Sequence, residues 1–151
     1  LYPTKFNDVP EVEEDVCIPF GRARIVAEGA DITVVTNSMM TIKAEKAVRQ
    51  LQKEGISAEL IDLRTIVPLD TETIIRSVKK TGKLLIVDEG HLSFGITGEI
   101  ASRIMPDVFY DLDAPIQRMG TADVPLPFSP ALEFPLIPDE KKIAAKIREM
   151  V

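Results

Sequence analysis

The chain has 151 residues, which is enough for one domain with a substantial core and too few for two large domains. Its formal net charge is -6 and the acidic residues are scattered, so the composition predicts neither nucleic-acid binding nor attachment to an anionic membrane. No apolar run approaches the roughly 20 residues of a membrane span. The single cysteine excludes an internal disulfide and suits a reducing compartment, so we expect a cytoplasmic protein.

Residues 1–19 carry three prolines and five acidic residues, which predicts an extended arm or linker. The first residue is Leu1 and not Met, and neither a basic leader nor an apolar signal core precedes it. We therefore expect a chain cut from a larger protein, in which residues 20–151 form one domain and the missing part holds any active site.

From Gly21 onward, strand-like and helix-like segments alternate. Five segments have the composition of strands: Arg24–Ala27, Asp31–Thr36, Ser57–Leu63, Lys83–Glu89 and Pro115–Met119. Four segments have helical spacing or helix-end signals: Met40–Leu51, Asp70–Lys80, Thr97–Met105 and Asp139–Met150.

The details of these segments predict how they are used. The turn "EGAD" (residues 28–31) could pair the first two strands in an antiparallel hairpin. Asp70 caps the second helix, and Gly82 follows its basic last turn. The strand Lys83–Glu89 is almost continuously apolar, which is typical of an interior strand with both faces covered. Strands separated by helices of this length predict one α/β domain with a mostly parallel sheet and helices on both faces.

Ligands of open α/β sheets bind at the carboxyl ends of the strands, so the glycine-containing loop Gly90–Gly98 is a candidate site. Gly95 and Gly98 could bring backbone N–H groups to a phosphate at a helix N-terminus. Their spacing is G-x-x-G, and not the G-x-G-x-x-G of a dinucleotide site, so a tight strand-to-helix turn is the favoured interpretation. A free-standing module that binds a nucleotide or phosphate at this loop remains the alternative.

The remaining polar candidates give no catalytic motif. His91 could be a general base, but no motif places a nucleophile beside it, and a solvent-facing loop histidine is favoured. Asp88 and Glu89 are adjacent, so on a strand they point to opposite faces and cannot act as a pair. Asp62 and Arg64 could form an ion pair or contact a partner. One His and one Cys, far apart, predict no metal site in this domain.

Several stretches resemble one family: "GRARIVAEGADITVVTNSMM", "EGISAELIDLRTIVPLDTETIIRSVKKTGKLLIVDEG", "FGITGEIASRI", "LDAPIQRMGTADVPLPFSPALE" and "IPDEKKIAAKIREMV". Together they resemble the carboxyl-terminal domain of the beta subunit of thiamine-diphosphate-dependent 2-oxo acid dehydrogenases, within the transketolase superfamily. That group acts on pyruvate, branched-chain 2-oxo acids or acetoin. The stretches Phe128–Glu133 and Ala114–Gln117 look closer to the acetoin or generic bacterial type than to the mitochondrial pyruvate type.

The resemblance implies a three-layer α/β/α fold with a five-stranded, mostly parallel sheet in which one strand is antiparallel. It implies no catalytic, cofactor-binding or metal-binding residue in this domain, and no activity for the domain alone. In the full-length complex it implies thiamine diphosphate and a divalent metal, held by the upstream domain and the alpha subunit.

The resemblance also implies partners. The alpha subunit and a second beta subunit would form an α2β2 heterotetramer, and the basic peripheral-subunit-binding domain of the dihydrolipoyl acyltransferase would dock near the carboxyl end. Candidate docking groups are Asp113, Asp123 and the terminal carboxylate of Val151. The apolar side chains of "VPLPFSPALEFPLIP" (residues 124–138) could cover the domain's own core or an exposed subunit interface, and we favour the interface for part of them.

Overall fold

The structure is a computed structural model that describes residues 17–151, so most of the predicted arm lies outside the described residues. Residues 17–20 are exposed and precede the first strand. The strands are β1 (Arg24–Ala27), β2 (Ile32–Thr36), β3 (Ala58–Asp62), β4 (Leu84–His91) and β5 (Gln117–Thr121). The helices are α1 (Ser38–Lys53), α2 (Thr71–Thr81), α3 (Ile96–Val108), α4 (Pro130–Glu133) and α5 (Glu140–Met150), with 3-10 turns at Phe109–Asp111 and Phe134–Leu136.

The five strands form one sheet in the order β1-β3-β2-β4-β5. Strands β2, β3, β4 and β5 run parallel, and β1 pairs antiparallel with β3. This is the expected five-stranded sheet with one antiparallel strand. Strand β4 lies between β2 and β5, and its first four residues are buried, so the predicted interior strand is confirmed.

The predicted hairpin between the first two strands is wrong. Strand β1 pairs with β3, and the register places Arg24 opposite Asp62 and Ile25 opposite Ile61. The five residues of β2 are all buried, and this strand bonds to β3 on one side and β4 on the other, so no edge remains for β1. The short, half-exposed β1 instead occupies the edge of the sheet, where its exposure is tolerated.

The chain between β1 and β2 crosses over the start of β3. The N–H groups of Ala30 and Asp31 donate to the Ser57 carbonyl at 2.9 and 2.8 Å, and the Ser57 N–H donates to Asp31 Oδ2 at 2.7 Å. At the crossing, a Cβ on Gly29 would lie 2.2 Å from the backbone carbon of Ala58. Only glycine permits this approach, so the residue is required by the crossing.

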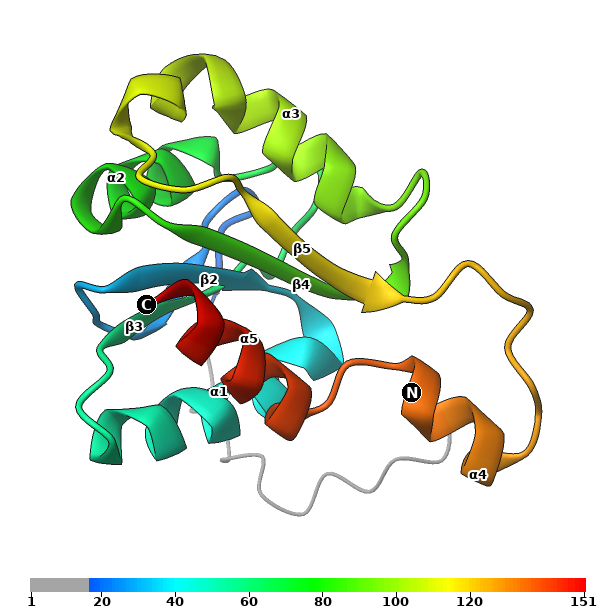
Figure 1. The fold of residues 1–151 in the computed structure, drawn as a ribbon. Helices are drawn as coiled ribbons and strands as arrows, with labels where there is room; N and C mark the ends of the chain where they lie inside the picture. Colours follow the sequence, from blue (N-terminus) through cyan, green and yellow to red (C-terminus); the bar gives the residue numbers. More distant parts are fainter. Residues whose placement is uncertain (1–16) are drawn as a thin grey trace.

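Two helix layers cover the sheet (Figure 1). Side chains of a strand alternate between its faces, and β4 shows this directly: Leu85 and Val87 join the core beneath α1 and α5. Leu84 and Ile86 join the second core, beneath α2 and α3. The predicted three-layer α/β/α fold is therefore observed, with one apolar core on each side of the sheet.

Some element boundaries differ from prediction. Helix α3 continues through Pro106 to Val108, because a proline near the end of a helix removes only one intrahelical hydrogen bond. Strand β4 extends to His91, where it pairs with Thr121 after a register shift. The proline-rich segment (residues 124–138) contains the four-residue helix α4 and a 3-10 turn. Within residues 17–151, no helix has the length and apolar character needed to cross a membrane.

Two glycine substitutions test the crossing. Gly29→Ala forces a methyl group into the backbone of β3, and we expect it to lower the free energy of unfolding by more than about 3 kcal/mol. Gly55→Ala is the matched control: its φ of +88° is also unfavourable for alanine, but no atom lies within 4 Å of the new methyl group. Its expected cost is about 1–2 kcal/mol. Urea unfolding measures both, and equal losses would contradict the role given to the crossing.

Candidate functional site

The parallel strands end at one edge of the sheet, and three non-glycine residues there have positive φ. They are Ser38 after β2 (φ 48°), Arg64 after β3 (φ 57°) and Phe94 after β4 (φ 56°). The left-handed region is costly for side chains of this kind, and such residues gather at functional sites. At the same edge, Asn37 Oδ1 is buried without a hydrogen-bond partner among the described residues. The carboxyl edge is therefore the first place to look for function.

The loop after β3 is fixed by Asp70. Its carboxylate accepts hydrogen bonds from the Ala23 N–H (2.9 Å), the Thr73 N–H (3.1 Å) and the Thr73 hydroxyl (2.9 Å). Burial raises the pKa of Asp70, but the hydrogen bonds from Ala23 and Thr73 and the charge of Arg22 outweigh it, so the pKa lies below its usual value. The predicted helix cap is confirmed, and it also ties the loop to the residues before β1.

Asp62 and Arg64 do not form the predicted ion pair within the described part of the chain. Asp62 Oδ1 accepts from the backbone N–H of Arg64 at 3.2 Å and from the Thr41 hydroxyl at 3.3 Å. Arg64 itself is exposed to solvent. Asp62 therefore shapes the loop, and contact of Arg64 with a partner, the other expectation for this pair, stays a prediction.

The loop after β4 is tied to the chain that follows β5. Asp123 accepts two hydrogen bonds from Ser93, one from its N–H (3.2 Å) and one from its hydroxyl (2.5 Å). These bonds, with a smaller contribution from His91, hold the pKa of Asp123 below its usual value. The Nδ1–H of His91 donates to the Ala122 carbonyl at 2.9 Å. We call the Ser93–Asp123 contact the clasp.

His91 is exposed at the last position of β4, as expected for a solvent-facing histidine. The nearest hydroxyl along the chain, that of Ser93, donates to Asp123 and makes no hydrogen bond to the imidazole. Asp88 accepts from the Gly90 N–H at 3.0 Å and so closes the turn. Across the described residues, no three His, Cys, Asp or Glu side chains come together as a metal ion requires.

The two glycines of the candidate phosphate loop have packing explanations. A Cβ on Gly95 would lie 2.0 Å from the His91 carbonyl oxygen, and one on Gly98 would lie 3.1 Å from the guanidinium of Arg118. That guanidinium donates to the Leu92 carbonyl at 3.3 Å. The tight strand-to-helix turn therefore accounts for Gly95, whereas Gly98 lies in the first turn of α3 and meets only the end of a flexible side chain.

The three candidate docking groups lie apart. Asp123 is at the carboxyl edge, after β5. Asp113 is at the amino edge, where its N–H donates to the Gly82 carbonyl at 2.8 Å and its carboxylate lies against Gly82. Val151 is also near the amino edge but on the opposite helix layer, at the end of α5 (Figure 1). No single surface contains all three.

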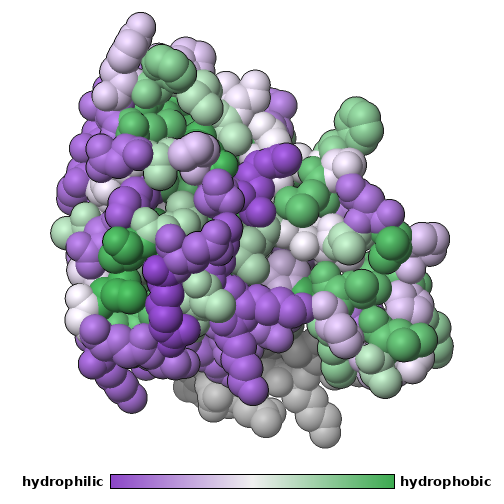
Figure 2. Space-filling view, in the orientation of Figure 1, coloured by the Kyte–Doolittle hydropathy of each residue, from purple (hydrophilic) through white to green (hydrophobic). Residues whose placement is uncertain are grey.

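Among the described residues, the hydrogen bonds that hold the proline-rich segment to the rest of the domain lie near its two ends. Its first residues follow the clasp, and its last residues are held by Lys142, which donates to the carbonyls of Pro135 and Ile137, and by Lys43, which donates to the Pro138 carbonyl at 3.0 Å. Between these anchors its large apolar side chains face outward, and green atoms gather over this part of the molecule (Figure 2). The exposed set is Val124 (43%), Leu126 (46%), Phe128 (102%), Leu132 (62%) and Phe134 (67%), and Phe94 on the loop after β4 is also exposed (110%).

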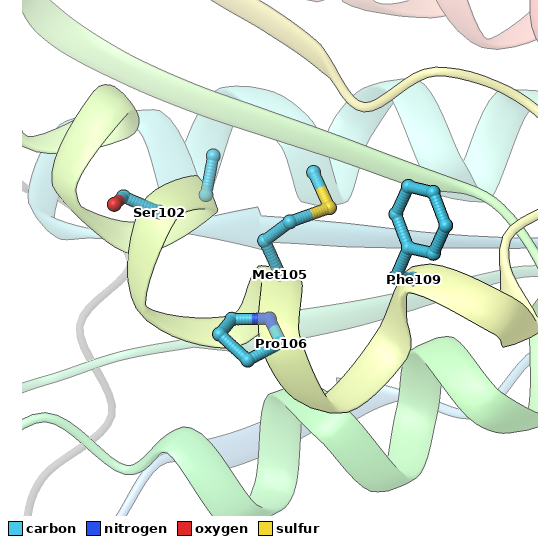
Figure 3. A pocket seen from close by; sticks show the side chains of 5 residues that line it. Ser102, Met105, Pro106 and Phe109 are labelled. Carbon is cyan, nitrogen blue, oxygen red and sulfur yellow. The ribbon is translucent and has the colours of Figure 1, made fainter.

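A second apolar region lies along α3. A shallow hollow of about 510 Å³ is lined by Ala101, Ser102, Met105, Pro106 and Phe109 (Figure 3). A neighbouring hollow of about 640 Å³ continues toward β5 and includes Asp113 and Arg118. The first hollow has no ionisable side chain in its lining, so it offers no acid–base chemistry.

The chain is thus an open α/β domain with exposed apolar side chains at its carboxyl edge and no assembled catalytic group among the described residues. The family profile described as the transketolase C-terminal domain matches residues 21–143. The chain belongs to this family, and the resemblance found in the sequence is confirmed.

Individual relatives agree. The pyruvate dehydrogenase E1 component subunit beta of Rickettsia felis is 47% identical over 99% of this chain and 45% of that protein. The 2-oxoisovalerate dehydrogenase subunit beta of Bacillus subtilis is 41% identical over 91% of this chain and 42% of that protein. The acetoin:2,6-dichlorophenolindophenol oxidoreductase subunit beta of Cupriavidus necator is 42% identical, with 95% and 42% covered. The acetoin-type relative is thus no more similar to this chain than the bacterial pyruvate-type relative is.

Among solved structures, a split-gene transketolase described as an inactive beta4 tetramer has a TM-score of 0.76 and 27% identity, over 94% of this chain and 45% of that chain. This chain therefore spans about half the length of the relatives it matches. In each relative, the part that matches this chain corresponds to the sheet and the two helix layers described above.

The Asp70 cap gives a pH-dependent prediction. We expect Asp70→Ala to lower the free energy of unfolding at pH 7 by about 1–2 kcal/mol, because a helix cap and a tertiary hydrogen bond are lost. Since folding lowers the pKa of Asp70, its contribution is complete above the ordinary value of about 3.9 and is lost as the pH falls through and below it. The difference from wild type should therefore shrink between pH 5 and pH 3, in urea titrations at each pH.

Asp139→Ala is the matched control, because the Asp139 side chain caps α5 through the Lys142 N–H and makes no other hydrogen bond among residues 17–151. It should cost less than the Asp70 variant at pH 7. An Asp70→Ala effect that persisted undiminished at the lowest pH would contradict the charge-based explanation.

Proposed function

We propose that this domain assembles and docks the beta subunit of a thiamine-diphosphate-dependent 2-oxo acid or acetoin dehydrogenase, and that it is inactive alone. The full-length enzyme would decarboxylate or cleave its substrate and transfer the acyl group to a lipoyl arm. The observation that carries the proposal is the exposed apolar surface at the carboxyl edge, on a domain of a family whose relatives are named as dehydrogenase beta subunits.

The lack of activity in isolation is supported by the site itself. Within residues 17–151, the chemically capable side chains at the carboxyl edge are engaged in shaping loops: Asp70 caps a helix, Asp88 closes a turn and Ser93 bonds to Asp123. The similar split-gene transketolase is described as an inactive beta4 tetramer, which agrees with an activity that needs another subunit.

Thiamine diphosphate and a divalent metal belong, in this proposal, to the full-length complex. A diphosphate held through a metal ion needs a converging set of oxygen ligands, and the described residues provide no such group of three acidic, histidine or cysteine side chains. The upstream domain and the alpha subunit would supply that site. No catalytic step is assigned to residues of this chain.

The proposed partners are the alpha subunit, a second beta subunit and the basic peripheral-subunit-binding domain of the acyltransferase. Asp113, Asp123 and Val151 remain candidate docking groups, and their positions divide them: Asp113 and Val151 face the amino edge, whereas Asp123 is already bonded to Ser93 at the carboxyl edge. The proposed location is the cytoplasm, as the bacterial relatives suggest, although relatives from Arabidopsis and Dictyostelium are named mitochondrial.

The alternative function is a free-standing module that binds a nucleotide or phosphate at the Gly90–Gly98 loop. The positive end of α3 and the nearby Arg118 are the features in its favour. Against it, the backbone of this loop is crowded at Gly95, and Arg118 is turned onto Leu92 and Thr97.

Calorimetric titration separates the two functions. The assembly function predicts no heat when ADP, NAD or thiamine diphosphate is added to this domain, and no turnover of pyruvate by the domain with thiamine diphosphate and Mg²⁺. Full-length beta subunit mixed with its alpha subunit should turn over the substrate and serves as the positive control. Saturable heat with ADP that disappears in Gly98→Val would favour the nucleotide module instead.

A charge reversal tests the docking residues. Asp123→Lys should slow association with the acyltransferase binding domain, because complementary charges act chiefly on the on-rate, and the effect should be larger at low salt. Asp107→Lys, an exposed acid on α3, makes the same charge change and is the matched control. Stopped-flow mixing measures both, and an unchanged rate for Asp123→Lys at low salt removes Asp123 from the candidates.

A further inference from the structure

Glu59 places a carboxylate inside the domain, near the start of β3. The residue is 2% exposed, and its carboxylate bonds to the ammonium group of Lys80 in the last turn of α2. It also accepts the N–H of Gly29 at 3.3 Å, and the Lys80 ammonium lies 3.5 Å from the carboxylate of Glu28. Burial raises the pKa of Glu59, but hydrogen bonds, chiefly from Lys80, outweigh it, so the pKa lies below its usual value. The buried carboxylate is therefore charged at neutral pH and depends on Lys80 for its counter-charge.

Helix α2 is the firmly held side of this contact. Thr33 of β2 is buried, and its hydroxyl oxygen lies 2.7 Å from that of Ser77 and 2.7 Å from that of Thr81, both on α2. These two positions flank Lys80 along the helix. Val78, between them, is fully buried against the sheet. The ammonium group is therefore presented by a helix that is bonded to the interior of the sheet.

The other side of the contact is the segment formed by β1 and the crossing, residues 24–31, which we call the strap. None of its residues is buried, and its strand pairs only with β3, in an irregular register. Before the strap, the Ala23 N–H donates to Asp70, and after it Ile32 begins the fully buried β2. The strap is therefore attached at both ends and has no buried side chain in between.

Segments with few buried contacts open from the native state more readily than the core does. The Glu59–Lys80 contact opposes such an opening, because the backbone of Gly29 in the strap covers the carboxylate and bonds to it. Without the charge of Lys80, a closed strap would bury an uncompensated carboxylate, which is costly. An open strap would let water reach Glu59. Loss of the counter-charge therefore favours the open strap.

We propose that the Glu59–Lys80 contact is a latch that keeps the strap closed over β3, and that its loss lets the strap open locally while β2, β3 and β4 stay paired. This inference goes beyond the proposed function and does not rest on it. An open strap uncovers the hydrogen-bonding edge of β3, which is a template for pairing with another chain. The latch therefore sets how often that edge is exposed.

The test is hydrogen–deuterium exchange at pH 7 on the natural full-length protein, measured by mass spectrometry of peptides. In Lys80→Met, which removes the counter-charge, exchange at residues 24–31 should be roughly tenfold faster or more. Exchange at residues 84–87 of β4 should change by less than about twofold, because the opening is local. Lys79→Met is the matched control: this neighbouring ammonium lies 3.8 Å from the exposed carboxylate of Asp111, so its loss should leave exchange at residues 24–31 unchanged.

A double variant keeps the test informative even if Lys80→Met does not fold. Glu59→Gln retains an oxygen that can accept from Gly29, and Glu59→Gln combined with Lys80→Met leaves no uncompensated charge in the interior. We expect the double variant to exchange residues 24–31 about threefold faster than wild type and more slowly than Lys80→Met, because the two side chains act as a pair.

The outcomes are distinct. Acceleration confined to residues 24–31 supports the latch, whether or not the protein associates with other subunits, so failure of the proposed function leaves this result unaffected. Acceleration of residues 84–87 by the same factor would overturn the latch and make the contact a contributor to global stability. Unchanged exchange at residues 24–31 in Lys80→Met, or in the double variant where the single variant does not fold, would also overturn it.

Discussion

The backbone crossing at Gly29 is the constraint on which the order of the sheet depends. The chain leaves the antiparallel edge strand β1, passes over the first residues of β3 and enters the interior strand β2. Because the crossing leaves both edges of β2 free, β3 and β4 can bind it on either side in parallel. The parallel set then places four strand ends, and the loops that follow them, at one edge.

Much of this fold is predictable because its signals are local. The buried run of β4, the helical spacing of α1 and the cap at Asp70 each depend on residues within a few positions of one another. The pairing of β1 is different: its partner lies more than thirty residues along the chain, and the turn before β2 has the composition of a hairpin. The requirement for glycine at position 29 can be seen only in the folded structure, where the backbone of residues 57–59 lies against it.

The same distinction separates the parts of the site. That His91 is exposed and that Gly95 forms a tight turn could be predicted from the loop sequence alone. That Asp123 is bonded to Ser93 could not, because the two residues are 30 positions apart and neither belongs to a recognisable motif. The relative position of Asp113 and Val151 could likewise not be predicted from the sequence: both lie at the amino edge, but on opposite helix layers. The family resemblance indicates the kind of function, whereas the packing determines where these residues lie in the domain.

The parallel course of α1 and α5 has a consequence for where partners can bind this domain. Arg148, in the last turn of α5, bonds through Nε and Nη2 to the two carboxylate oxygens of Glu54 at the end of α1, both at 2.7 Å, so the two helices finish at the same end of the sheet. The chain terminus is thereby carried to the end opposite the proline-rich segment, a separation of at least one strand length, roughly 17–20 Å. Partners bound at these two ends would therefore contact different residues of the domain.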